Sequence, residues 1–270
     1  MLSGLSRTLT HVTAGLYFIL GAALFFLPAQ MAPVFAWKVT RFMTMTIGGW
    51  CLGNAWLAFF TARRWEWRLV YPAMVYLWSF GILEASIVIL FRDKLQLADP
   101  IAWVYLLTLV INVLAALLGF ADWLRIRPSN PVSDKMTGFM RFLAIAFVVF
   151  VGFLGAYGLT ARIGDLGTNR EIFPEVMSLF TLRSFGAFYF SLAIGMIPLL
   201  FERSRTPFLG YGFLTLGLII IITVAAFAHL SLFDFAEHPF GTVYFAAYMV
   251  AGLIAAFLFW RYGTGSARSH

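Results

Sequence analysis

Glu84 is the residue of this chain whose position most favours chemistry. It is the only carboxylate well inside an apolar run of helix length, about seven residues, or roughly 10 Å, from the end of that run. A carboxylate at such depth is costly in a bilayer and normally faces the interior of a helix bundle with a partner. Two interpretations follow: a proton or cation site, or a structural ion pair with Arg41 at the mouth of the neighbouring helix.

Two amides accompany this acid. Asn54 and Asn112 fall near the middle of their own apolar runs, in the same half of the chain as Glu84. Such side chains either contact a ligand or form interhelical hydrogen bonds worth roughly 0.6–2 kcal/mol.

Arg41 and Arg183 stand at the starts of two apolar runs. Together they could bind an anion, such as a lipid phosphate, a quinone oxygen or a substrate carboxylate. Alternatively, each anchors its helix and pairs with an acid, Arg41 with Glu84 and Arg183 with Glu175.

Histidines and lysines bear on cofactors. His11 and His229 are expected at opposite membrane faces, roughly 30 Å apart, so we expect no bis-histidine haem. The lysines lie in loops or at run ends, which leaves no buried amine for a covalent retinal. A metal site in one short turn is a further candidate, although its spacing matches no established motif: His229, Asp234, Glu237 and His238.

Composition shows which elements must position these residues. Of 270 residues, 61% are apolar and 11% charged, and the mean hydropathy is +0.87. Soluble domains are nearer 45–50% apolar and about 25% charged, so a water-soluble globule is excluded. Apolar runs of roughly 20 residues predict an all-α bundle in a lipid bilayer. The net charge is +7, and the basic residues lie in short loops between the apolar runs. Their position there reflects membrane orientation rather than nucleic-acid binding.

Hydropathy predicts eight transmembrane helices, so both termini share one side. Of the 19 Lys and Arg residues, twelve fall on that side, which predicts cytoplasmic termini in the inner (cytoplasmic) membrane. The outer segment 161–182 is expected to form a short helix on the membrane surface. The predicted spans are 11–28, 42–62, 69–91, 101–121, 139–160, 184–201, 208–230 and 240–260.

The chain also contains an internal duplication. The segment 99–105 aligns with 238–244 at an offset of 139, and Arg41 aligns with Arg183 at an offset of 142. These matches predict two parallel four-helix repeats, 1–128 and 139–270, joined by a cytoplasmic linker, 129–138.

The two repeats differ at the candidate site. The equivalents of Glu84, Asn54 and Asn112 are Thr223 and positions close to Met196 and Ala251. A site, if present, is therefore expected within residues 40–115.

The run from Leu182 to Gly195 resembles bacterial four-helix membrane domains of the DoxX-like kind, in which an arginine and spaced glycines often open the second helix. In the first half Arg41 and Gly49 fit this pattern loosely. The resemblance implies the fold of each repeat more than an activity.

No catalytic motif stands out, so the sequence favours a non-catalytic accessory or scaffolding subunit. Such a subunit would bind lipid, quinone or pigment beside other membrane subunits or as a homo-oligomer. Two alternatives stay open: a small-solute or proton-coupled permease using Glu84, and a membrane redox protein or enzyme.

Overall fold

The computed structural model describes residues 2–128, 135–169 and 171–262. Apart from an isolated bridge between Lys135 and Ser204, these residues form helices and the turns between them. The long helices are α1 (Gly4–Phe26), α3 (Arg41–Arg64), α4 (Trp67–Leu90), α5 (Pro100–Ile126), α6 (Gly138–Thr160), α7 (Leu179–Leu200), α8 (Arg205–Ala228) and α9 (Gly241–Tyr262). The short ones are α2 (Pro28–Met31), η1 (Ala32–Val34), η2 (Arg92–Lys94) and η3 (Leu230–Leu232).

Seven of the long helices in the described part of the chain are long and apolar enough to cross a membrane. The predicted multi-pass helical class is therefore confirmed. The exception is α3, in which sixteen of the 24 residues are buried, among them Thr44, Gly49 and Asn54. Because its neighbours cover these small and polar side chains, α3 needs less hydrophobicity than a helix that faces lipid.

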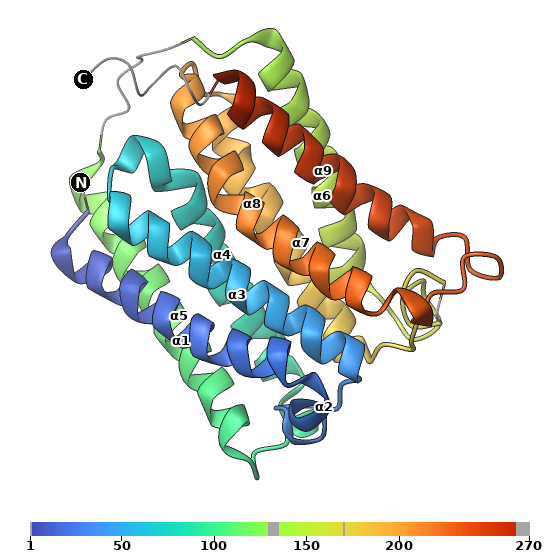
Figure 1. Cartoon of the computed structure of the whole chain (residues 1–270). Coiled ribbons are helices and arrows are strands. Elements are labelled where there is room, and N and C mark those ends of the chain that lie inside the picture. The colour runs from blue at the N-terminus through green and yellow to red at the C-terminus, as the bar shows by residue number, and fades with distance from the viewer. Residues whose placement is uncertain (1, 129–134, 170, 263–270) are drawn as a thin grey trace.

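The long helices pack in two groups (Figure 1). In one group α3 lies against α1 and α5 lies against both α1 and α4; in the other α7 lies against α6 and α9 against α8. The most extensive contacts between the groups are those of α3 with α8, α7 with α4, and α4 with α8. As a result α3 and α7 are enclosed, whereas α6 and α9 keep most of their apolar surface exposed.

Glycines allow the closest helix approaches. A Cβ added to Gly48 of α3 would stand 2.5 Å from the backbone nitrogen of Phe25 in α1. In the second group a Cβ on Gly186 of α7 would stand 2.3 Å from the backbone nitrogen of Leu159 in α6. Small residues at such crossings let backbones pack directly, as is common in membrane bundles.

Hydroxyl caps begin most of the long helices. Ser3, Thr40, Thr137 and Ser178 each accept a hydrogen bond from the backbone N–H three residues later. These caps explain why α1 and α7 begin earlier than the spans predicted from residues 11 and 184. In α1 the polar residues Ser6, Arg7 and Thr8 lower the hydropathy of the first turn, yet the Ser3 cap keeps this turn helical.

The segment 161–182 corrects the sequence-based expectation of a surface helix. Its described residues form turns until α7 begins at Leu179. Gly164 and Gly167 adopt positive φ, and the Asp165 carboxylate accepts the backbone N–H of Arg162. Of the apolar run 176–180 that favoured a surface helix, Met177 and Phe180 are buried in the core, whereas Val176 is exposed.

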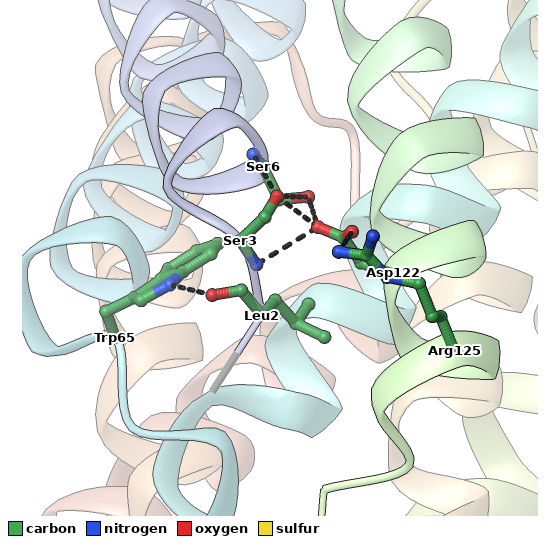
Figure 2. A network of polar contacts seen from close by, with 6 residues as sticks. All are labelled: Leu2, Ser3, Ser6, Trp65, Asp122 and Arg125. Atoms are coloured by element: carbon green, nitrogen blue, oxygen red, sulfur yellow. Dashed lines mark hydrogen bonds and ion pairs between the residues drawn. The ribbon is translucent and has the colours of Figure 1, made fainter.

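Polar contacts tie the chain start to the bundle end that contains it, here called the amino-terminal end (residues 2–7, 62–71, 122–127 and 199–205). Arg7 Nε donates to the Ala62 carbonyl at 2.8 Å, and the Trp65 indole donates to the Leu2 carbonyl at 3.2 Å. Figure 2 shows the neighbouring cluster, in which Ser3 binds the Asp122 carboxylate. The opposite end comprises residues 27–40, 91–99, 161–169, 171–178 and 229–240.

Candidate functional site

Helices α1, α3, α4, α5 and α7 enclose a cavity of about 30 Å³, enough for one or two water molecules. Four helices of the first group form most of its wall, and α7 of the second group closes it. The lining residues are Tyr17, Leu20, Trp37, Ile47, Trp50, Cys51, Asn54, Phe80, Glu84, Tyr105, Thr108, Leu109, Thr181 and Ser184. Two predicted site residues, Asn54 and Glu84, therefore share one cavity.

Glu84 is 4% exposed and is held by hydroxyl groups rather than by a cation. Its Oε1 accepts a hydrogen bond from Tyr105 at 2.7 Å and another from Ser184 at 2.9 Å. Its Oε2 has no hydrogen-bond partner among the described residues. One carboxylate oxygen is thus fixed in place by two hydroxyls, while the other is buried without a partner among the described residues.

The interpretation of Glu84 as the ion-pair partner of Arg41 is wrong for the described structure. Arg41 is the exposed first residue of α3, whereas Glu84 lies buried inside α4. No ion pair in the described part of the chain involves either residue. The hydroxyls of Tyr105 and Ser184 occupy the position that the arginine was expected to take.

Asn54 brings an unpaired donor to the same cavity. Its Oδ1 accepts a hydrogen bond from Tyr76 at 2.6 Å, which orients the amide. Its Nδ2 has no partner in the described residues, and neither does the indole nitrogen of Trp50 one turn earlier on α3. Buried polar atoms are normally hydrogen-bonded, so two unpaired donors and one unpaired acceptor around one cavity indicate that it binds water or another small polar species.

Asn112 lies beside this cavity rather than in its wall. Its Nδ2 donates to the Tyr17 hydroxyl at 2.8 Å, and Tyr17 in turn lines the Glu84 cavity. On its other side Asn112 lines a second cavity of about 10 Å³, together with Thr10 and Thr13. Gly81 makes room for the amide, since a Cβ there would stand 2.9 Å from Nδ2.

Trp37 covers the cavity toward the opposite end. It is 2% exposed, its indole N–H donates to Thr181 at 3.0 Å, and its ring stacks on Phe180 with centroids 4.3 Å apart. These contacts come from the chain between α1 and α3 and from α7, so both helix groups contribute to the cover.

Arg183 does not form the predicted pair with Glu175. Its guanidinium lies over the Phe91 ring at 5.5 Å and donates to the Ala161 carbonyl at 3.3 Å. These contacts join α7 to the residues that follow α4 and α6 near the opposite end. They give Arg183 a packing role outside the cavity.

The four candidate metal ligands of the outer turn do not form a metal site. His229 Nδ1 lies 3.2 Å from the Ala225 carbonyl, and Asp234 accepts the backbone N–H groups of Ala236 and Glu237. His238 faces Glu171 at 4.0 Å. The described residues hold no group of three His, Cys, Asp or Glu side chains that could bind a metal ion.

Four further residues line the cavity that the sequence did not indicate as site residues: Tyr17, Trp50, Tyr105 and Ser184. A signal existed for Tyr105, because it closes the repeated segment 99–105. Comparison with family models, curated proteins and solved structures finds no match to this chain. The DoxX-like resemblance therefore stays a prediction.

Proposed function

We propose that this chain is a small-solute permease whose transport is coupled to proton binding at Glu84. The observation that carries the proposal is that three residues lining one cavity each have a buried polar atom without a partner among the described residues: Glu84 Oε2, Asn54 Nδ2 and Trp50 Nε1. Buried acids inside a membrane bundle typically mark ion pathways and proton relays.

The chemistry of the cavity favours a proton over a larger cation. Its volume of about 30 Å³ admits a water molecule or hydronium ion without rearrangement. The carboxylate oxygen would take the proton, while the amide and indole N–H groups would hold the oxygen of the accompanying water. Glu84 has no salt-bridge partner among the described residues that would keep it permanently ionised.

The bundle offers a way for such a site to face either side. We infer eight spans, α3 included, arranged as two four-helix repeats, with cytoplasmic termini in the inner membrane. In support, α1 packs against α3 much as α6 packs against α7. If α3 corresponds to α7 and α4 to α8, the contact of α3 with α8 also corresponds to the contact of α7 with α4. Parallel repeats of this kind occur in transporters that rock one half against the other around a central site.

The site occurs once, in keeping with the difference between the repeats. The repeat equivalents of Glu84 and Ser184 are Thr223 and Phe42. Phe42 packs against the rings of His229 and Phe233. At the equivalent position a threonine thus replaces the carboxylate, and an aromatic residue replaces its serine partner.

Cys51 provides a test that does not require knowledge of the solute. It is the single cysteine of the chain, it lines the Glu84 cavity, and it is 6% exposed. In sealed membrane vesicles of either orientation, a small membrane-impermeant thiol reagent should label Cys51 slowly from both faces. The matched control is Ala58→Cys in a Cys51→Ala background, because Ala58 is fully buried two turns along α3 and lines neither described cavity.

Labelling from both faces, with the Ala58→Cys control unlabelled, supports the permease. Labelling from neither face or from one face overturns alternating access to the cavity. The accessory-subunit hypothesis would then regain weight, and co-purification of stoichiometric partner subunits would test it. The third alternative, a membrane redox protein or enzyme, predicts a bound chromophore or a turnover activity in the purified protein.

A further inference from the structure

We propose that the proton bound by Glu84 arrives from the amino-terminal end of the bundle along a polar face of α1, and that the hydrogen bond between Asn112 and Tyr17 is the gate on this path. The inference deepens the proposed function and rests on it. Its observations, however, come from a different part of the molecule.

The path begins with a stripe of hydroxyl groups on α1. Ser3, Ser6, Thr10, Thr13 and Tyr17 follow one another at intervals of three and four residues, which places them on one face of the helix. The last four are between 1% and 5% exposed. Ser and Thr are common where membrane helices pack, so such a row points to a path only where one of its hydroxyls has no partner.

The entrance lies at the surface of the amino-terminal end. The Asp122 carboxylate of α5 accepts hydrogen bonds from the side chains of Ser3 and Ser6, as Figure 2 shows. Its other oxygen lies 3.5 Å from Arg125, and its side chain remains 14% exposed. Asp122 can therefore exchange protons with water and is in direct contact with the first two hydroxyls of the stripe.

A small cavity continues the path inward. Thr10, Thr13 and Asn112 line the second cavity, whose volume of about 10 Å³ suits one water molecule. The Thr13 hydroxyl is buried and has no partner among the described residues. The Thr10 hydroxyl, by contrast, donates to the Ser6 carbonyl at 2.8 Å, as hydroxyls in helices often do. An unpaired hydroxyl on a water-sized cavity indicates a water site.

Asn112 and Tyr17 separate this water site from the Glu84 cavity. The Asn112 amide donates to Tyr17 at 2.8 Å, so the Tyr17 oxygen accepts from the amide while its own proton is free for the cavity side. An amide does not pass protons on, because it neither gains nor loses one near neutral pH. Continuous water between the two cavities therefore requires this hydrogen bond to open.

Cysteine labelling tests the path. In a Cys51→Ala background, Thr13→Cys should react with a small water-soluble thiol reagent applied from the amino-terminal side about tenfold faster than Ala14→Cys. Ala14 is the matched control, because it is the next residue on α1, is 5% exposed and lines neither cavity. Equal rates at the two positions, or reaction of Thr13→Cys only from the opposite side, would overturn the path.

The gate has its own test in the chain that retains Cys51. Tyr17→Phe removes the hydroxyl that Asn112 binds and should raise the labelling rate of Cys51 from the amino-terminal side by about tenfold, with no change from the opposite side. An unchanged rate from the amino-terminal side overturns the gate.

The two proposals fail separately. If Cys51 is labelled from both faces but Thr13→Cys is not labelled, the path fails and the permease stands. If Thr13→Cys is labelled from the amino-terminal side while Cys51 is never labelled, the path is a water-filled vestibule and the permease fails.

Discussion

Gly81→Ala is expected to disturb the candidate site through a single methyl group. A Cβ at this position would stand 2.9 Å from Asn112 Nδ2 and 3.0 Å from its Cγ. Both distances are shorter than a normal van der Waals contact, so the amide must move and its bond to Tyr17 is lost. Overpacking costs about 1–3 kcal/mol and one hydrogen bond about 0.5–1.5 kcal/mol, which predicts a loss of roughly 2–4 kcal/mol in the free energy of unfolding.

A double-mutant cycle isolates the cause. Asn112→Ala removes the group that the new methyl meets, so the double variant should lose at least about 1 kcal/mol less than the sum of the single variants. The measurement is denaturant-induced unfolding of the purified chain in mixed micelles. Additive losses would contradict this expectation, because they would mean that Gly81 is required for a contact with a residue other than Asn112.

Three further predictions concern the packing and the polar contacts. Gly186→Ala should lower the free energy of unfolding by about 3 kcal/mol or more in the same assay, because its Cβ would meet backbone atoms of α6. Gly212→Ala, whose Cβ would meet nothing within 4 Å, should be neutral or stabilise the chain by up to about 1 kcal/mol. Similar losses for the two variants would contradict the close approach of α6 and α7. Asp122→Asn should cost about 1–2 kcal/mol, since a neutral amide accepts the Ser3 and Ser6 hydrogen bonds more weakly, and full stability would show that this cluster does not hold the chain start. Tyr105→Phe and Ser184→Ala should each lower the free energy of unfolding of wild type by about 1–3 kcal/mol, because each removes a hydrogen bond to Glu84. In a Glu84→Leu background the same substitutions should lower it by less. Equal losses in both backgrounds would show that the hydroxyls do not act through Glu84.

Hydropathy and the position of single polar residues were enough to predict much of the fold. Apolar runs of the length of a membrane helix are rare by chance, so seven predicted spans correspond to helices that could cross a bilayer. The same reasoning selected Glu84 and Asn54, because an ionised or amide side chain is conspicuous against an apolar background. Both lie in one cavity.

The partners of these residues could not be predicted in the same way. Ser184 reaches Glu84 from a helix 100 positions away, and nothing in its own surroundings distinguishes it from other serines. The Arg41–Glu84 interpretation was wrong because it took into account neither the depth of Glu84 inside α4 nor the rotation of each helix about its axis. That rotation follows from packing, here from the close contacts of α3 with α1 and α8.

The segment 161–182 was misjudged for a local reason. Its apolar residues suggested a surface helix, but two glycines at positive φ and an aspartate that binds its own backbone favour turns. Met177 and Phe180 are then buried in the bundle instead of lying on the lipid surface.

The most direct test of the proposed site at Glu84 asks whether this residue presents a free carboxylate oxygen to the cavity. The rate at which Cys51 reacts with a positively charged thiol reagent is compared with its rate toward a neutral reagent of the same size. We expect a preference for the cation in wild type that disappears in Glu84→Gln and persists in Glu66→Gln, whose carboxylate is exposed at the amino-terminal end. The same ratio in wild type and Glu84→Gln would contradict this expectation.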